Sequence, residues 1–249
     1  MYNRFGNVFD EGLSSGKSID NLFVEIPAML KLVKGVRPKG KQLLDLGCGG
    51  GMQARRYIQL GAIVTGIDVS QPLLEIARKR APKATFLQMD MRRLSFPKNS
   101  FDIVTSSLAM HYVPWKKLVK QVHKVLKKNG HFIVSTTHPW DDARRRIFEH
   151  GKKYSVAGRI VDLRTGKQRV VGNYFSEGVT EADWGHGGFK VRWYHQTMQS
   201  IIQNALKNGF RLEDLIEPKP LHSAKKRDKR RYDYMVKFPV MILFKFKKE

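Results

Sequence analysis

The chain has little cysteine, little acid and no long apolar run. Its single cysteine, Cys48, leaves no partner for a disulfide within the chain. No run of about 18 apolar residues is present, so we expect no membrane span. The N-terminus lacks the apolar segment of a secretory signal, and we therefore expect a cytoplasmic protein. Acidic residues number 22 against 46 lysines and arginines, which gives a formal net charge of +24.

This excess of positive charge would attract nucleic acid, anionic lipid headgroups or acidic substrates. Much of it is spread over expected helix faces, where a solvated surface is the ordinary explanation. The exception is a dense basic stretch near the C-terminus, made of Lys225, Lys226, Arg227, Lys229, Arg230 and Arg231. Two interpretations stay open: a mobile surface loop that keeps the protein soluble, or a loop that contacts phosphate near the mouth of an active site.

The most informative stretch joins an apolar run that contains Asp45 to a glycine-rich turn (47–51) and a helical segment that begins at Met52. This order predicts a buried parallel strand, a tight turn and a helix N-terminus. Gly47 and Gly49 permit a positive φ and leave space for a ligand. Open α/β sheets bind ligands at the carboxyl ends of such strands, so we expect a binding site here.

Two kinds of nucleotide ligand fit such a turn. A dinucleotide fingerprint that starts at Gly47 fails, because Met52 stands at the third glycine position. One that starts at Gly49 passes formally, with Ala54 last. The carboxylate of Asp45 is more decisive, since it would repel a pyrophosphate but can accept a hydrogen bond from an ammonium group. We therefore favour a cofactor with an amino-acid moiety.

Two further apolar runs also end in an acid. Asp68 ends the first and is positioned to bind both hydroxyls of a ribose, although it could also cap the following helix. Asp90 ends the second, and beside it Met91 could pack on an adenine ring whose exocyclic amine donates to the carboxylate. A fourth run (101–107) would close the crevice. Three acids at successive strand ends are a stronger signal than the glycines alone.

These segments, DLGCGGG, GIDVS, QMDM and SFDIVTSSLAMHYV, together resemble the class I S-adenosylmethionine-dependent methyltransferases, of the small-molecule, type 11-like branch. The resemblance is specific over residues 42–137 and looser from there to the C-terminus. It implies an α/β fold with a Rossmann-like seven-stranded, mostly parallel sheet, an antiparallel C-terminal strand, helices on both faces and a cap insertion. S-adenosyl-L-methionine would be the cofactor and S-adenosyl-L-homocysteine the product.

The resemblance also implies cofactor-binding roles, which fall on Asp45, Gly47, Gly49, Asp68, Val69, Asp90, Met91 and Ser106. It does not name the methyl acceptor.

Candidates for the acceptor side come from the residues themselves. His111 follows the fourth strand, where a neutral imidazole could accept a proton from a hydroxyl or amine, or could simply pack beneath the cap. His138, Trp140, Tyr194 and His195 are candidates for substrate contact, the last two at the start of an expected helix. The histidines are scattered rather than set at ligand spacing, so we expect no metal site.

The sequence predicts a single domain in four parts: an N-terminal helical cap (1–41), a cofactor-binding core (42–137), an insertion or cap (138–190) and a C-terminal helix with strands (191–249). The N-terminal cap should cover the pocket and break near Pro27. The other expected elements are a helix at 114–128, a strand at 131–137, a hairpin from 155–160 and 167–174, a helix at 194–207, and antiparallel strands at 210–216 and 235–246.

The leading functional hypothesis is methyl transfer to an oxygen or nitrogen of a small molecule. The alternative is an RNA methyltransferase, motivated by the charge of +24 and the basic stretch. Against it, residues 106–109 read SSLA, whereas enzymes that methylate exocyclic base amines resemble [N/D/S]-P-P-[Y/F] there. A third hypothesis is a cofactor-binding protein without catalysis, which would be expected to have lost the glycines or acids that this chain retains.

Overall fold

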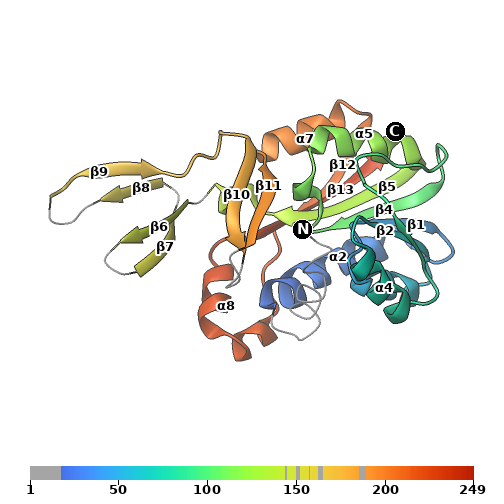
Figure 1. Cartoon of the computed structure of the whole chain (residues 1–249), viewed down its shortest axis with the longest axis horizontal. Coiled ribbons are helices and arrows are strands. Elements are labelled where there is room, and N and C mark those ends of the chain that lie inside the picture. The colour runs from blue at the N-terminus through green and yellow to red at the C-terminus, as the bar shows by residue number, and fades with distance from the viewer. Residues whose placement is uncertain (1–17, 144, 150–151, 157, 162–164, 185–188) are drawn as a thin grey trace.

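The computed structural model describes residues 18–143, 145–149, 152–156, 158–161, 165–184 and 189–249. One seven-stranded sheet organises them (Figure 1). Its strands are β1 (Gln42–Leu46), β2 (Ile63–Asp68), β3 (Thr85–Gln88), β4 (Phe101–Ser107), β5 (Leu126–Thr137), β12 (Phe210–Ile216) and β13 (Met241–Lys248).

The strand order is β12-β13-β5-β4-β1-β2-β3. Strands β1 to β5 pair in parallel, whereas β13 runs antiparallel to both of its neighbours, β5 and β12. The chain moves outward from β1 to β3 and then returns to the other side of β1 at β4, which makes the gap between β1 and β4 a topological switch point. The predicted Rossmann-like fold with an antiparallel C-terminal strand is confirmed.

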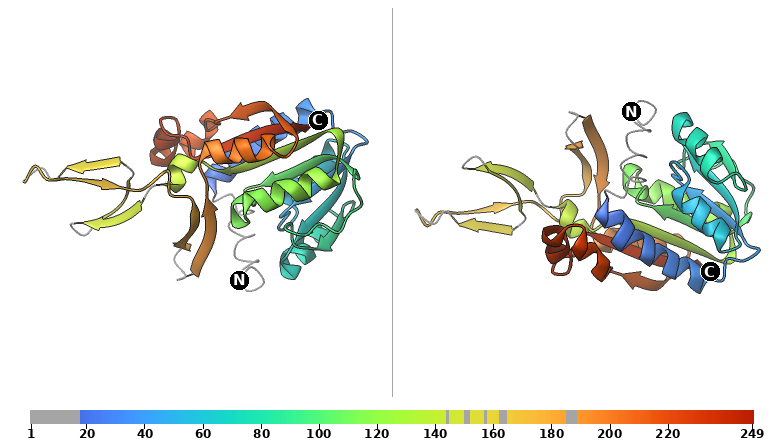
Figure 2. Two further views of the ribbon diagram at one scale, coloured as in Figure 1. Left: turned by 90° about the horizontal axis from the view of Figure 1, so that it is seen from above. Right: turned by 90° about the horizontal axis from the view of Figure 1, so that it is seen from below.

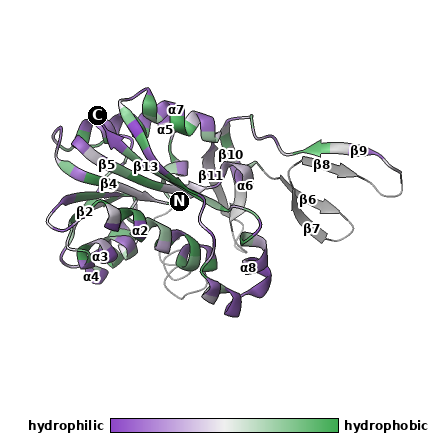
Figure 3. Ribbon diagram, turned by 180° about the vertical axis from the view of Figure 1, so that it is seen from behind, coloured by the Kyte–Doolittle hydropathy of each residue, from purple (hydrophilic) through white to green (hydrophobic). Residues whose placement is uncertain are grey.

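Helices cover both faces of the sheet (Figure 2). One face carries α5 (Trp115–Val125) and α7 (Met198–Leu206), and the other carries α2 (Ile26–Gly35), α3 (Met52–Gln59) and α4 (Gln71–Arg80). The covering helices carry both apolar and polar residues (Figure 3), and their apolar residues pack against those of the strands. Each face therefore has a buried apolar layer of its own.

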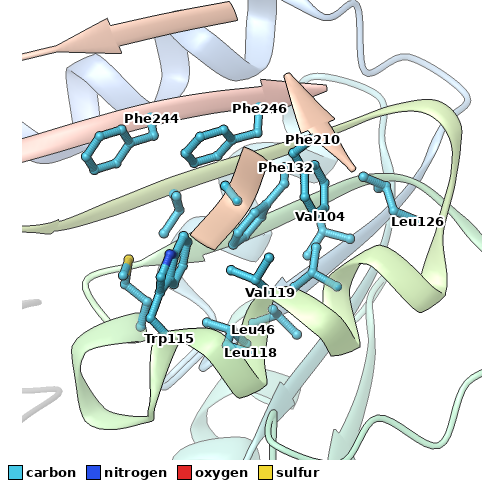
Figure 4. Packing of buried hydrophobic residues seen from close by; sticks show 14 of the residues in the cluster. Leu46, Val104, Trp115, Leu118, Val119, Leu126, Phe132, Phe210, Phe244 and Phe246 are labelled. Atoms are coloured by element: carbon cyan, nitrogen blue, oxygen red, sulfur yellow. The ribbon is translucent and has the colours of Figure 1, made fainter. Parts of the chain in front are cut away.

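Aromatic rings dominate the layer beneath α5 (Figure 4). Trp115 and Phe132 stack with their ring centroids 5.6 Å apart, and Phe246 lies within 6.4 Å of both rings. The indole Nε1 of Trp115 donates to the carbonyl of Ile201 in α7 at 2.8 Å, so its one polar atom is satisfied. This layer holds α5 and α7 against β5 and β13.

The N-terminal segment is helical on both sides of the expected break. A short π-helix, η1 (Asn21–Glu25), runs directly into α2, so the helical geometry changes without an interruption. Pro27 lies in the first turn of α2, and the carbonyl of Phe23, which its missing N–H leaves without an α-helical donor, accepts instead from the Leu221 amide at 2.8 Å. Residues 1–17 of the predicted N-terminal cap lie outside the described residues.

Two predicted boundaries near the C-terminal half are wrong. The helix expected to reach residue 128 ends at Val125, and β5 starts at Leu126, because Leu126 already pairs with Phe101 of β4. The last strand begins at Met241 rather than at residue 235. Residues before it form α8 (Lys229–Met235), in which the Asp228 side chain caps the helix by accepting from the Arg231 amide.

The described residues of the cap insertion form three antiparallel pairs, where the sequence predicted one hairpin. They are β6 (Arg145–Glu149) with β7 (Lys152–Val156), β8 (Gly158–Val161) with β9 (Gln168–Val171), and β10 (Gly178–Trp184) with β11 (Phe189–His195). The first two pairs project away from the sheet, while β11 lies beside it (Figures 1 and 2). Strand β11 crosses the predicted boundary of the cap at residue 190.

Tyr194 and His195 therefore end a strand and do not begin a helix, which corrects that prediction. Pairing with β10 fixes them in extended conformation. The helix α7 starts at Met198, where the Thr197 hydroxyl accepts from the Ser200 amide. No helix in the part of the chain that the structure describes has the length and apolar character needed to cross a bilayer.

The aromatic layer yields a stability prediction. Phe132→Ala removes a fully buried ring from the centre of the layer and should lower the free energy of unfolding by about 3–5 kcal/mol. Phe175→Ala, at a ring that is 83% exposed, should change it by less than about 0.5 kcal/mol. Urea unfolding followed by circular dichroism measures both variants. Equal losses would contradict this assignment of the core.

Candidate active site

A cavity of about 280 Å³ opens at the carboxyl ends of β1, β2, β3 and β4, next to the switch point of the sheet. The glycine turn after β1 and the segments after the other strands form most of its wall. The N-terminal segment closes another side, through Asn21, Glu25 and Ile26. These three residues are the part of the predicted cap (1–41) that lines the cavity.

Positive φ angles shape the turn after β1. Gly47 has φ of 68° and Gly49 has φ of 51°, a region that side chains with a Cβ rarely adopt. A Cβ at Gly47 would lie 2.5 Å from the Cβ of Ala109, so this glycine allows the turn to approach the segment after β4. At Gly49 nothing lies within 4 Å of such an atom. The turn thus leaves open space on its cavity side.

Asp68 holds this turn in place. Its Oδ2 accepts from the Gly49 amide at 3.0 Å, and its Oδ1 accepts from the Ser70 amide at 2.9 Å, just before α4. The carboxylate also lines the cavity. Asp68 can therefore accept from the backbone before α4 and still face a ligand. Burial raises its pKa, although the amide hydrogen bonds oppose that rise. Its neighbour Val69 lines the cavity and is 48% exposed.

Asp45 lies at the bottom of the cavity. Its Oδ1 accepts from the Thr105 hydroxyl at 2.9 Å, whereas its Oδ2 is buried and has no partner among the described residues. Burial raises its pKa to about 7, and the charges of Glu25 and Asp68 add to the rise. An unpaired carboxylate oxygen on the wall is ready to accept a hydrogen bond from a ligand.

Asp90 and Met91 both line the cavity, but Asp90 is already engaged. Its carboxylate accepts from the backbone amide and the Nε of Arg92, each at 2.8 Å, and forms an ion pair with the guanidinium. The hydrogen bond from Arg92 lowers the pKa of Asp90. A ligand amine would therefore share this carboxylate with Arg92, which also lines the cavity.

Ser107, rather than the predicted Ser106, lies on the cavity wall. The side chain of Ser106 is fully buried, and its hydroxyl has no partner among the described residues. Side chains alternate along a strand, so a shift of one residue moves a side chain to the opposite face. The Ser107 hydroxyl donates to Glu25 Oε1 at 2.7 Å.

Glu25 is a wall residue that the sequence reasoning missed. Its carboxylate accepts from Ser107, from the Ser135 hydroxyl of β5 at 2.6 Å and from the Gln53 amide of α3 at 3.1 Å. The only available signal was an acid between the apolar residues Val24 and Ile26 of a helical segment. Burial raises its pKa despite these three donors.

The predicted acceptor-side histidines are occupied by contacts within the protein. His111 does not line the cavity, although its neighbour Tyr112 does. Its Nδ1 lies 3.2 Å from the Thr136 hydroxyl, and burial lowers its pKa to about 4. His138 caps α6 (Pro139–Asp142), where its Nδ1 accepts from the Trp140 amide at 3.1 Å. Its Nε2 then faces Glu217 Oε1 at 2.9 Å, which fixes the ring on both sides.

None of the four predicted substrate contacts, His138, Trp140, Tyr194 and His195, lines the cavity. The Nε2 of His195 donates to the carbonyl of Tyr174 at 2.8 Å, so the ring makes a hydrogen bond within the cap. Strand β11, which carries Tyr194, does pack against the short helix η2 (Met110–Tyr112) at the cavity wall. The cap thus lies beside the cavity, but those four side chains do not form its surface.

The basic stretch is helical rather than a loop. It spans η3 (His222–Lys226) and the start of α8, with Arg231 bound to Asp20 and Lys229 bound to Asp233. The amide of Leu221 donates to the carbonyl of Phe23 at 2.8 Å, which places the stretch against η1. Within the described residues, no group of three or more His, Cys, Asp or Glu side chains could hold a metal ion.

This sheet, with its one antiparallel strand and a glycine- and acid-lined cavity at the switch point, defines a Rossmann-like fold that binds a nucleoside cofactor. Comparison with known proteins is more specific. The model of a methyltransferase-domain family matches residues 44–134. An uncharacterized protein of Haemophilus influenzae is 33% identical over 211 residues, which cover 80% of this chain and 77% of that protein.

A solved S-adenosylmethionine-dependent methyltransferase from Mesorhizobium loti is 28% identical, with a TM-score of 0.71, over 88% of this chain and 96% of that one. The ubiquinone biosynthesis O-methyltransferase of Coxiella burnetii is 32% identical over 116 residues, 44% of this chain and 50% of that enzyme, so the similarity spans only half of it. The chain belongs to the class I S-adenosylmethionine-dependent methyltransferases, and S-adenosylmethionine is its cofactor. These relatives give no support to the RNA alternative.

The raised pKa of Asp45 predicts a pH-dependent stability. In the folded protein this carboxyl binds its proton more tightly than in the unfolded chain, where its pKa is near 3.8. The stability it contributes is complete below pH 3.8 and is lost as the pH rises through about 7. Asparagine does not titrate. The stability of Asp45→Asn relative to wild type should therefore increase by roughly 2–3 kcal/mol from about pH 5 to about pH 8.

Urea unfolding of the ligand-free proteins at the two pH values measures this difference. Glu75→Gln, at an exposed position of α4, serves as the control and should show no such trend. A difference between Asp45→Asn and wild type that is independent of pH would contradict the burial of an ionisable, unpaired carboxyl.

Proposed function

We propose that this protein transfers the methyl group of S-adenosylmethionine to an oxygen or nitrogen atom of a small molecule. The observation that carries the proposal is the acid-lined cavity at the switch point, where an unpaired Asp45 oxygen lies beside the glycine turn. A ubiquinone biosynthesis O-methyltransferase among the relatives supports a small acceptor. We infer that residues 42–137 bind the cofactor, while 1–41 and 138–190 cover it and help to bind the acceptor.

The proposed cofactor contacts follow the cavity wall. Asp45 would accept from the ammonium group of the methionine moiety, and Asp68 from the ribose hydroxyls. Asp90 would share its carboxylate between Arg92 and the adenine amine, with Met91 against the ring.

The backbone at Gly47 and Gly49 would leave room for the cofactor, and Val69 would contribute an apolar wall. Ser107 takes the place that Ser106 held in the sequence-based assignment, because Ser107 lines the cavity. All seven of the other predicted cofactor residues also line it.

When bound, the cofactor supplies a methyl group that a sulfonium already activates. The chain must therefore align a nucleophile with that methyl group and exclude water. The N-terminal segment and Tyr112 close the cavity for this purpose. His111, the sequence-based candidate for proton acceptor, does not line the cavity, and burial lowers its pKa to about 4, which makes it a weak base at pH 7.

The cofactor assignment predicts a binding defect in Asp68→Ala. The variant loses the proposed ribose acceptor as well as the hydrogen bond that holds Gly49, so its affinity for S-adenosylmethionine should fall by about 1–3 kcal/mol. Isothermal titration calorimetry measures the change, and Glu75→Ala on the exposed side of α4 should bind as wild type does. Binding of NADH in place of either sulfur cofactor would overturn the proposal.

The acceptor class predicts where methyl label appears. Incubation of the protein with S-adenosylmethionine that carries a tritiated methyl group and with fractionated cell extract should label the small-metabolite fraction. Label in the RNA fraction would instead support the nucleic-acid alternative. In that case RNA binding should weaken as the salt concentration increases, and it should be weaker in the Lys225→Ala, Arg230→Ala double variant than in wild type. Label in protein alone would contradict both hypotheses.

A further inference from the structure

Asp45 and Thr105 face each other across the switch point of the sheet. They are partners in the register of β1 and β4, the two parallel strands on either side of that point. Leu43 and Ile103 precede them by two residues in the same strands, so all four side chains lie on one face of the sheet, the face that α3 covers. The pair is thus a polar contact beside an apolar layer, at the point where that layer meets the cavity.

The contact between them is a buried hydrogen bond. Thr105 is 0% exposed and Asp45 is 1% exposed. The Thr105 hydroxyl has one proton, and it lies 2.9 Å from Asp45 Oδ1 but 3.4 Å from the carbonyl of Leu44. The shorter distance and the charge of a carboxylate both favour donation to Asp45. A valine would have nearly the same shape beside an apolar layer, so the hydroxyl is the part of Thr105 that requires an explanation.

This hydrogen bond gives the two oxygen atoms of Asp45 different surroundings. Oδ1 is held from β4, whereas Oδ2 has no partner among the described residues, and the side chain lines the cavity. The last torsion of an aspartate side chain is soft, so its carboxylate turns readily unless one oxygen is held. Thr105 itself is not among the wall residues. It therefore fixes the direction of the unpaired oxygen without touching the cavity.

The same hydrogen bond favours the charged form of Asp45. Burial raises the pKa of Asp45 to about 7, the hydrogen bond from Thr105 opposes that rise, and the charges of Glu25 and Asp68 add to it. Within the described part of the chain, Thr105 supplies the only hydrogen bond to this carboxyl group. Its loss would leave both oxygen atoms of a buried carboxyl group without a donor from the protein.

We propose that Thr105 is a positioning residue for cofactor binding, whose hydroxyl orients Asp45 so that the unpaired oxygen accepts from the ammonium group of the cofactor. The inference rests on the proposed contact between Asp45 and that ammonium group. Thr105 acts through Asp45, because it does not line the cavity. Without the hydroxyl, the carboxyl group is less firmly oriented and more readily protonated, and both changes weaken a charge-assisted hydrogen bond.

Two ligands separate this role from a general effect on the cavity. S-adenosylhomocysteine carries the amino-acid moiety, whereas methylthioadenosine keeps the nucleoside and the thioether but has no ammonium group. Thr105→Val should weaken binding of the first by about tenfold at about pH 6.5 and of the second by less than about twofold. Thr105→Ser keeps the hydroxyl and should bind both ligands within about twofold of wild type. Isothermal titration calorimetry measures all of these affinities.

The pH dependence is a readout that a purely structural role would not produce. In Thr105→Val the pKa of Asp45 should lie above its wild-type value, so the carboxylate forms at higher pH. The loss of affinity for S-adenosylhomocysteine should therefore shrink from about tenfold at about pH 6.5 to about twofold at about pH 8.5. A ratio of wild type to variant at each pH removes the titration common to both proteins. That common part includes the other titratable groups that face Asp45, which are Glu25, Asp68, Cys48 and Tyr57.

A double-mutant cycle shows whether Thr105 acts through Asp45. Asp45→Asn should weaken the binding of S-adenosylhomocysteine, and Thr105→Val added to it should cause a further change of less than about twofold. Equal losses for the two ligands in Thr105→Val, an unchanged affinity for S-adenosylhomocysteine, or additive losses in the double variant would overturn the inference.

Failure of the proposed function gives a different result. If Asp45→Asn binds S-adenosylhomocysteine as wild type does, the proposed contact of Asp45 is rejected, and the role of Thr105 with it. If wild type binds neither S-adenosylmethionine nor S-adenosylhomocysteine, the proposed function itself is rejected. Circular dichroism checks the fold of each variant. If Thr105→Val does not fold, Thr105→Ala also lacks the hydroxyl and is judged by the same ratios.

Discussion

The hydrogen bond from the Gly49 amide to the Asp68 carboxylate joins the glycine turn after β1 to the end of β2. It shapes the cavity, because it fixes a turn with positive φ at Gly47 and Gly49 against β2. The Gly51 amide also donates to the Cys48 carbonyl at 3.0 Å, and Arg80 donates to the Gly50 carbonyl. The amide of Cys48 donates a further hydrogen bond to the carbonyl of Ile67 in β2 at 2.9 Å. The Asp68 carboxylate therefore fixes the glycine turn in addition to lining the cavity. A substitution of Asp68 will change both the shape of the turn and the contacts available to a ligand.

A second polar connection brings remote parts of the chain to the same cavity. Glu25 links the N-terminal segment to β4 through Ser107 and to β5 through Ser135. On the outer side, Arg231 of α8 pairs with Asp20, and Val24 packs with Met235 and neighbouring apolar residues. The N-terminal segment thus joins α8, β4 and β5, and the wall of the site depends on tertiary contacts that no single motif contains.

The sequence was informative where the signal is local. The acids at or just beyond the ends of β1, β2 and β3 (Asp45, Asp68 and Asp90) could be predicted because an apolar run, an acid and a turn follow one another directly. The choice between Ser106 and Ser107 could not, because the side of β4 that faces the cavity is set by tertiary packing, in which Ser107 donates to Glu25 of the N-terminal segment. Tyr194 and His195 favoured a helix locally, but pairing with β10 placed them in a strand. Glu25 escaped notice because two of its donors, Ser107 and Ser135, are 82 and 110 residues away in the sequence.

A basic surface and an acid-lined cavity occur together in this protein, and the physics of screening explains how both can matter. Exposed lysines and arginines interact over about 8–10 Å at physiological salt, beyond which counterions cancel their field. The basic residues of η3 and α8 therefore affect what approaches the surface near the N-terminal segment. Burial shields the carboxyl groups of the cavity from salt and also raises the pKa of Glu25, Asp45 and Asp68, so a cationic ligand would favour their charged forms. A strongly basic exterior is consequently compatible with a site for a cationic ligand, and the value of +24 describes the surface of the protein rather than the chemistry of its cavity.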